Sequence, residues 1–337
     1  MAKVLVTGAT GFIGQHLVRR LLDENYTVRA MKHGTGKLHF FKNEEVEWWE
    51  ADLGNKGTLK GICKKVDIVY HCAAISRNDL SKTWDDFDTI NIKGTKFLLQ
   101  EAETSGVKRF VFVSTVEAAG YGDGINPRKE TDTPNPINNY GKSKLEAEKI
   151  VMNSEWNMAC VTLRLPMIYG PGTFLIVPKL FGMVKRGFYP FIGDGLALME
   201  FCYVDNAVEA ILLAGKKKQA AGETFYVSDE RSYTIKEVIK HISTAMNVRP
   251  IFLYIPKFMA YTFALFFELI AKKIPFPPII SPVSRKPFFT RETVFWTTKN
   301  VNVVSTEKIK RVLGYKPVVS IGEGCTRTAT WLKSYLK

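Results

Sequence analysis

The sequence of 337 residues contains few cysteines, and they follow no pairing pattern. Cys63, Cys72, Cys160, Cys202 and Cys325 are scattered, with no Cys-x-x-Cys and no Cys/His cluster. This spacing argues against a disulfide framework and a zinc-type site, so we expect reduced thiols and no structural metal. The sequence also lacks internal repeats and low-complexity segments.

Acidic residues are in deficit. The chain has 33 Asp and Glu against 47 Lys and Arg, which gives a formal net charge of +14. Nucleic acid is not expected as a partner, because no nucleic-acid motif accompanies the charge. A lysine-rich solvated surface, an anionic membrane face and a phosphate-bearing ligand remain as explanations. Met1-Ala-Lys leads directly into an apolar segment, so we expect no signal peptide and a cytoplasmic protein.

The densest group of glycines lies near the start of the chain. Residues 7–14 read Thr-Gly-Ala-Thr-Gly-Phe-Ile-Gly, between an apolar strand expected at 4–6 and a helical pattern at 15–22. In such a unit the glycines permit a sharp bend, let a pyrophosphate approach the main chain and let helix pack on strand. The helix N-terminus offers free N–H groups to the phosphates. The motif in this context predicts dinucleotide binding.

The second expected strand, at 26–31, ends without a carboxylate. An Asp or Glu at this position binds the ribose 2′-hydroxyl of NAD. Here Arg29, Lys32, His33 and Lys37 occupy the region instead. Cations favour a 2′-phosphate, so we expect NADP in preference to NAD, which remains the alternative.

Further apolar segments at 46–52, 67–74 and 109–115 alternate with helical patterns. Strands that alternate with helices form parallel sheets with right-handed crossovers. The segment 109–115 is apolar along its length, as a strand buried on both faces should be. We therefore expect an α/β protein with a doubly wound parallel sheet, a Rossmann fold.

A tyrosine and a lysine stand four residues apart at the start of a helix expected over 145–152. Tyr140 and Lys144 would share one helix face. An ammonium about 4 Å from a phenol, at an effective dielectric of about 20, stabilises the phenolate by about 4 kcal/mol, or about 3 pK units. This would bring the phenol toward acid–base catalysis near neutral pH. The alternative is an exposed Tyr and Lys, but the hydroxyl pair Ser114-Thr115 at an upstream strand end favours catalysis.

Together these motifs resemble the extended short-chain dehydrogenase/reductase superfamily, which contains the NAD-dependent epimerase/dehydratase family. They are TGxxGxxG at 7–14, NxxGT at 91–95, Ser114-Thr115 and Tyr140-x-x-x-Lys144, and the resemblance covers nearly the entire chain. It implies that Tyr140 is the acid–base and that Lys144 lowers its pKa and holds the nicotinamide ribose. A Ser usually binds the substrate oxygen, so Thr115 takes that role with Ser114 as the alternative.

The same pattern implies a dinucleotide site along the carboxyl ends of the strands. Its expected residues are Gly8, Thr10, Gly11, Phe12, Ile13, Arg29, Lys32, His33, Lys37, Asp52, Leu53, Ala73, Ala74, Asn91, Tyr140, Lys144, Pro166 and Ile168.

The substrate is less clearly marked. Residues 114–120 resemble the 3β-hydroxysteroid and sterol-carboxylate dehydrogenase branch. Met167 stands where nucleotide-sugar epimerases tend to carry an Asn, which counts against a sugar nucleotide. We expect interconversion of a secondary alcohol and a ketone on an apolar small molecule of sterol, isoprenoid or fatty-acyl type. A nucleotide-sugar epimerase or dehydratase with tightly bound NAD is the alternative, and a non-catalytic NADP(H) sensor is a third hypothesis.

The composition changes after about residue 230. Residues 255–271 are almost continuously apolar, but the run is shorter than the about 20 residues of a membrane span and contains Glu268. The segment 257–280 could be a core helix, could cap an apolar pocket, or could lie in a membrane interface with Lys272 and Lys273 at the headgroups. A homodimer is left open.

We expect two domains. The Rossmann domain would span 1–165, with 200–228 returning to it. A smaller, mostly helical substrate lobe would comprise 166–199 and 229–337.

Overall fold

The structure is a computed structural model that describes residues 2–34, 38–76, 82–174, 176–273, 290–299 and 303–335. A seven-stranded sheet, entirely parallel, dominates the first two thirds of the chain. Its spatial order is β11-β6-β5-β4-β1-β2-β3. Its strands are β1 (Lys3–Thr7), β2 (Thr27–Lys32), β3 (Glu47–Glu50), β4 (Ile68–His71), β5 (Arg109–Thr115), β6 (Ala159–Leu165) and β11 (Glu223–Tyr226).

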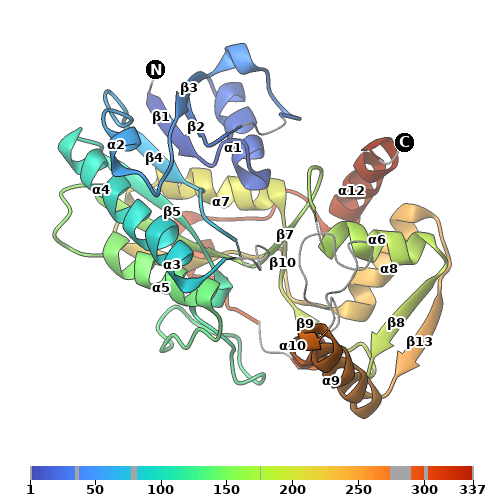
Figure 1. Cartoon of the computed structure of the whole chain (residues 1–337). Helices are drawn as coiled ribbons and strands as arrows, with labels where there is room; N and C mark the ends of the chain where they lie inside the picture. The colour runs from blue at the N-terminus through green and yellow to red at the C-terminus, as the bar shows by residue number, and fades with distance from the viewer. Residues whose placement is uncertain are drawn as a thin grey trace.

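Helices cover both faces of this sheet (Figure 1). α1 (Phe12–Asp23) and α7 (Val204–Lys216) pack on one face. The other face carries α2 (Lys56–Leu59), α4 (Gly94–Thr104) and α5 (Asn139–Val151). The short α3 (Trp84–Phe87) and a π-helical segment, η2 (Asp88–Lys93), lead into α4. The expected doubly wound parallel sheet is confirmed.

Alternation along the strands explains the two apolar layers. Val4 and Val6 pack in the cluster under α1 and α7, whereas Leu5 packs under α4 and α5. Because successive strand side chains point to opposite faces, a short apolar run serves both layers at once.

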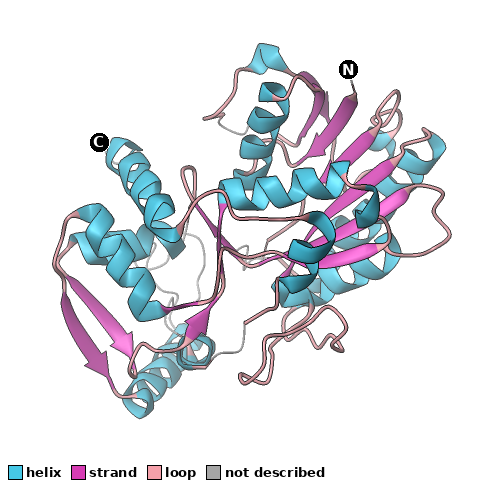
Figure 2. Ribbon diagram, turned by 180° about the vertical axis from the view of Figure 1, so that it is seen from behind, coloured by secondary structure: helices cyan, strands magenta, loops and turns pink. Residues whose placement is uncertain are grey.

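A smaller lobe is built mainly from the C-terminal third of the chain (Figures 1 and 2). Its core lies among α6 (Ile176–Lys185), α8 (Ile235–Met246) and α12 (Ile321–Tyr335). Three two-stranded pairs accompany it: β7 (Met167–Tyr169) with β10 (Phe201–Tyr203), β8 (Phe188–Ile192) with β13 (Ile251–Ile255), and β9 (Leu198–Met199) with β12 (Tyr233–Thr234). α11 (Glu307–Leu313) packs against β11 of the large sheet.

α9 (Lys257–Lys273) lies at the edge of this lobe and packs against α10 (Arg291–Thr298). Within residues 257–270 of α9, the small residues Ala260 and Ala264 are the ones fully buried, together with Val294 of α10. The hypothesis of a buried core helix is therefore wrong for the described part of 257–280. None of the described helices is long and apolar enough to cross a bilayer.

Candidate active site

The glycine turn between β1 and α1 brings bare main chain to the edge of the sheet. Gly8 has φ +66°, and a Cβ there would lie 2.9 Å from the Ala73 nitrogen. A Cβ on Gly14 would lie 2.0 Å from the Gly8 oxygen. Gly11 is the N-cap of α1 and has no side chain to occupy the first-turn N–H groups. This arrangement fits the phosphates of a dinucleotide. Thr10, Phe12 and Ile13 lie on the same turn, half-buried.

The end of β2 differs from the expectation at one position. Arg29 is buried, with Nη2 2.7 Å from Glu47 Oε1 and Nη1 3.1 Å from the Lys64 oxygen. Its guanidinium lies 5.2 Å from the centre of the Trp49 ring. The guanidinium of Arg29 is therefore bound to groups of the protein itself and does not face a cofactor phosphate. This corrects the prediction for Arg29.

The other cations at this edge remain accessible. Lys32 ends β2 half-buried, with its amine 5.5 Å from the Trp48 ring. His33 is exposed, 3.6 Å from Asp52 Oδ2. Lys37 lies outside the described residues. Asp52 also accepts a hydrogen bond from the Gly54 nitrogen at 2.8 Å.

A chain of buried hydrogen bonds runs from β1 toward α4. Thr7 Oγ1 lies 2.7 Å from His71 Nδ1, and His71 Nε2 lies 3.0 Å from Thr95 Oγ1. Thr95 donates to the Asn91 oxygen at 2.6 Å, so His71 donates through Nε2 and accepts at Nδ1. Burial and the nearby Lys144 lower the pKa of His71 to about 3, which keeps the ring neutral.

Asn91 continues this chain to α5. Its Nδ2 donates to Ser143 Oγ at 3.0 Å, and Ser143 in turn donates to the Tyr140 main-chain oxygen at 2.8 Å. Its Oδ1 accepts from the Ile75 nitrogen at 2.8 Å. Because the amide bonds protein atoms on both sides, Asn91 joins the segment after β4, at Ile75, to α5. The direct contact with the cofactor expected of it is not supported by this geometry.

Three other expected residues, Leu53, Pro166 and Ile168, are packed among apolar side chains or partly buried. Leu53 is buried beneath α4, where a Cβ on Gly94 would lie 2.7 Å from its own Cβ. Pro166 and Ile168 are half-buried where β6 passes into β7, and Ile168 packs against the clusters of both the sheet and the lobe.

Tyr140 lies in the first turn of α5 and is half-buried. Asn138 caps the helix, accepting from the Gly141 nitrogen at 2.8 Å and donating to Glu117 Oε2 at 2.7 Å. Thr115 ends β5, and its hydroxyl lies near enough to the Tyr140 phenol to lower the pKa of that phenol in part. The structure thus brings Thr115 and Tyr140 together, as the motif predicts.

Lys144 follows one turn later and is almost fully buried. Its Nζ donates to the Val113 oxygen at 2.8 Å and lies 3.9 Å from the centre of the Phe112 ring. Burial lowers the pKa of Lys144 to about 7, opposed by Glu148 and Cys72.

The pKa of Tyr140 is shifted in the direction opposite to our expectation. Burial and Glu117 raise it above its ordinary value, although the nearby Thr115 hydroxyl lowers it in part. The expectation assumed a fully charged Lys144. A buried amine with a pKa of about 7 is only partly charged at neutral pH, and so stabilises a phenolate less.

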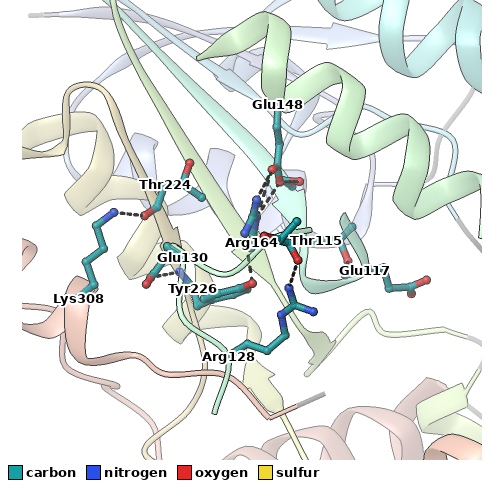
Figure 3. Close-up of polar contacts among 11 residues, drawn as sticks. Thr115, Glu117, Arg128, Glu130, Glu148, Arg164, Thr224, Tyr226 and Lys308 are labelled. Carbon is teal, nitrogen blue, oxygen red and sulfur yellow. Dashed lines mark hydrogen bonds and ion pairs between the residues drawn. The ribbon is translucent and has the colours of Figure 1, made fainter. Parts of the chain in front are cut away.

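Ser114 faces a different partner. Its hydroxyl donates to Glu148, which also accepts from Arg164 Nη2 at 2.7 Å. Arg164 Nη1 donates to the Tyr226 hydroxyl at 3.2 Å, so the group joins α5, β6 and β11 (Figure 3). Ser114 is thus bound to a buried ion pair, and the structure does not support it as the substrate-binding alternative.

Sequence reasoning did not identify the neighbours of the candidate catalytic pair. These are Thr7, His71, Thr95, Glu117, Asn138, Ser143, Glu148 and Arg164. The i+4 spacing of Glu148 from Lys144 was the one signal available in the sequence. Within the described residues, no group of three or more His, Cys, Asp or Glu side chains is arranged to hold a metal ion.

The chain resembles known proteins along most of its length. Residues 4–228 match the NAD dependent epimerase/dehydratase family. The chain is 30% identical to sterol-4-alpha-carboxylate 3-dehydrogenase, decarboxylating, of Mus musculus, over 97% of this chain and 90% of the relative. It is 28% identical to the UDP-glucose 4-epimerase of Vibrio cholerae, over 97% of this chain and 94% of the relative.

Among solved structures, the UDP-glucose 4-epimerase of Thermotoga maritima with UDP-glucose aligns at a TM-score of 0.77 and 26% identity. The alignment covers 99% of this chain and 100% of that one. Fold, motifs and relatives together define an NAD(P)-dependent oxidoreductase of the extended short-chain type, an enzyme that acts on a CH–OH group. The chain belongs to the NAD-dependent epimerase/dehydratase family.

Proposed function

We propose that this enzyme interconverts a secondary alcohol and a ketone on an apolar substrate of sterol, isoprenoid or fatty-acyl type. The observation that carries the proposal is the placement of Thr115 at the end of β5 near Tyr140 in the first turn of α5, with Lys144 buried one turn further on. The likeness to the mouse sterol-carboxylate dehydrogenase along nearly the whole chain supports the substrate class.

In this mechanism Tyr140 exchanges a proton with the substrate oxygen, and Thr115 holds that oxygen by a hydrogen bond. The bound nicotinamide supplies or accepts the hydride. Lys144 in its charged form stabilises the phenolate of Tyr140 and binds the cofactor ribose. Glycines 8, 11 and 14 leave room for the phosphates.

The test of these roles is Tyr140→Phe. It removes the proton donor but keeps the ring, so turnover should fall by about 10²- to 10⁴-fold while cofactor affinity stays within about twofold. Tyr254→Phe, on the exposed face of β13, is the matched control and should leave both unchanged. Turnover retained in Tyr140→Phe would exclude the assignment.

We propose NADP as the preferred form of the cofactor, held by Lys32 with His33 and Lys37. Two of these cations lie free of buried partners at the end of β2, and this supports a 2′-phosphate. Lys32→Ala should weaken NADPH binding by about tenfold and NADH binding little, as measured by quenching of protein fluorescence. Lys60→Ala, on the surface beyond α2, is the control. Tighter binding of NADH than NADPH to the unaltered enzyme would contradict the proposal.

A nucleotide-sugar epimerase is the second candidate, supported by the Vibrio cholerae relative. The half-buried Met167 on β7 offers no polar group to a sugar nucleotide, and this favours the apolar substrate. NADPH and NADH consumption against a panel of apolar ketones and UDP-sugars distinguishes the two. Purified protein that carries NAD and turns over a UDP-sugar would decide for the epimerase.

We further propose that α9 contacts a membrane surface from the cytoplasmic side. Its aromatic residues Phe258, Phe263 and Phe266 are about half exposed or more, and Lys272 and Lys273 end the helix. Replacing the three phenylalanines by serine should abolish co-flotation with vesicles that contain phosphatidylserine. If binding persists, or if the same variant instead dissociates a homodimer in sedimentation experiments, the membrane proposal fails.

We retain the division into two domains as a proposal. The pairing of β11 with β6, and the packing of α7 on the sheet, support the return of 200–228 to the first domain. The separate apolar cluster of α6, α8 and α12 supports a distinct substrate lobe formed by 166–199 and 229–337.

A further inference from the structure

One face of α5 carries three ionisable side chains in succession. Tyr140, Lys144 and Glu148 follow at intervals of four residues, so they lie one above the other along the helix. The first two belong to the proposed reaction. Glu148 has no role in the mechanism above, although it is only 4% exposed.

Glu148 is held directly by residues of two other elements, β5 and β6. It accepts from Ser114 at the end of β5, one residue before Thr115. It also accepts three hydrogen bonds from Arg164 of β6, at 2.7, 3.1 and 3.2 Å. Arg164 in turn is held by the Tyr226 hydroxyl of β11 (Figure 3). The carboxylate therefore has a fixed position beneath the site.

Such a buried pair needs an explanation other than stability. Two ions lose their hydration on burial, and well-packed apolar residues of the same volume often give an equally stable fold. A functional reason is available here, because Lys144 is buried too and its charged form is disfavoured.

Of the groups near Lys144 that are described below, Glu148 is the one that carries a negative charge near neutral pH. Tyr140 and Glu148 lie on its own helix, and the end of β4 contributes His71 and Cys72. His71 is neutral, and burial raises the pKa of the Cys72 thiol to about 12. From β5 the Val113 oxygen accepts its hydrogen bond, and the Phe112 ring centre lies 3.9 Å from the amine. Glu148 forms its ion pair with Arg164 and none with Lys144, so it acts on the amine at longer range than a direct ion pair.

We propose that Glu148 is a positioning residue that keeps the Lys144 amine charged and, through Ser114, fixes the strand end that presents Thr115. Arg164 keeps Glu148 ionised and in place. The inference rests on the proposed function, since it assigns Glu148 a role through Tyr140 and Lys144. It does not make Glu148 a catalytic residue.

The test is Glu148→Gln, which keeps the shape and removes the charge. Lys144 would lose its anion, so its pKa should fall by roughly one unit. The midpoint is read without substrate, from the pH titration of the Lys144 side-chain ¹³Cε resonance in ¹³C-lysine-labelled protein, assigned with Lys144→Met. Under the proposed mechanism, reduction of a 3-oxosteroid probe by NADPH requires charged Lys144. The alkaline, descending limb of its pH–rate profile should therefore move to lower pH by the same amount as the Lys144 pKa.

Two controls separate charge from structure. Glu148→Asp keeps the charge and should leave the titration midpoint within a few tenths of a unit. Ser114→Ala removes only the hydrogen bond from Ser114 to Glu148. It should lower the rate without moving the descending limb of the pH–rate profile. If Glu148→Gln fails to fold, because Arg164 is left unpaired, the double variant Glu148→Gln/Arg164→Gln removes both charges and should still lower the midpoint.

An unchanged Lys144 midpoint in folded Glu148→Gln, or in the double variant, would overturn the inference. A lowered midpoint of the Lys144 titration, with no movement of the descending limb of the pH–rate profile, would support the electrostatic role of Glu148. The same result would count against the proposed use of Lys144 in the reaction, so the two failures can be told apart.

Discussion

Helices α5 and α9 both depart from the ordinary pattern of buried apolar and exposed charged side chains, but in opposite ways. α5 buries Lys144 and Glu148, whereas α9 buries two alanines and exposes phenylalanines. Soluble proteins rarely bury charges without partners and rarely expose large contiguous apolar surfaces. Each reversal marks a place where stability was not the only requirement. Under the proposals above, the requirement on α5 is chemical, and on α9 it is contact with a membrane surface.

The strongest way to break the α5 arrangement is to remove the partner of its buried carboxylate. Arg164→Met leaves Glu148 uncompensated and should cost about 3–5 kcal/mol of unfolding free energy in urea titrations. The control is Arg231→Met, whose ion pair with Glu237 is exposed and should be worth at most about 1 kcal/mol. Equal losses in the two variants would mean that Glu148 is not effectively buried.

Replacing Lys144 should have the opposite effect on stability. Its pKa of about 7 lies below the ordinary 10.5, so between these values the unfolded chain binds more protons and wild-type stability rises with pH. The stabilisation is complete above pH 10.5 and is lost as pH falls to about 7. Lys144→Met removes this dependence and should be more stable near pH 7 by on the order of 2 kcal/mol, while turnover is lost.

The measurement is thermal or urea unfolding from pH 6 to 10. Lys149→Met, on the exposed side of the same helix, should show the wild-type pH dependence. A Lys144→Met protein that is less stable than wild type at pH 7 would show that the amine contributes more through its hydrogen bond than its burial costs.

The smallest effect is expected on α9. Phe266→Ser removes an exposed ring and should change the unfolding free energy by less than about 0.5 kcal/mol. Phe191→Ala, in the core of the lobe, should cost about 3–5 kcal/mol by comparison. A large loss in Phe266→Ser would show that α9 is covered in solution and would end the contrast between the two helices.

The sequence was sufficient for the order of elements. The apolar segments and the glycine turn predicted the parallel sheet, and the second strand, expected at 26–31, is found at Thr27–Lys32. These features depend on local patterns, which a sequence displays directly. The spacing of Tyr140 and Lys144 likewise predicted their common helix face.

The sequence was not sufficient for the direction of single polar side chains. Arg29 has the same strand parity as Met31, which packs under the helices of the α5 face, and its ion-pair partner Glu47 lies on another strand. The hydroxyl of Ser114 donates a hydrogen bond to the carboxylate of Glu148, 34 residues further along the chain. Partners at such separation leave no periodic signal. The upward shift of the Tyr140 pKa was missed for a related reason, since it depends on the burial of Tyr140 in the fold and on Glu117, 23 residues earlier in the chain.

The hydrogen-bond chain from Thr7 through His71, Thr95, Asn91 and Ser143 to the Tyr140 carbonyl has a consequence for protein engineering. A graft between relatives that exchanges only the glycine turn, or only α5, would treat the two segments as separate modules. In this enzyme they share an internal brace, so a graft that exchanges one end alone inherits mismatched hydrogen bonds at the other. The transferable unit is the set of braced segments, although they are far apart in the chain.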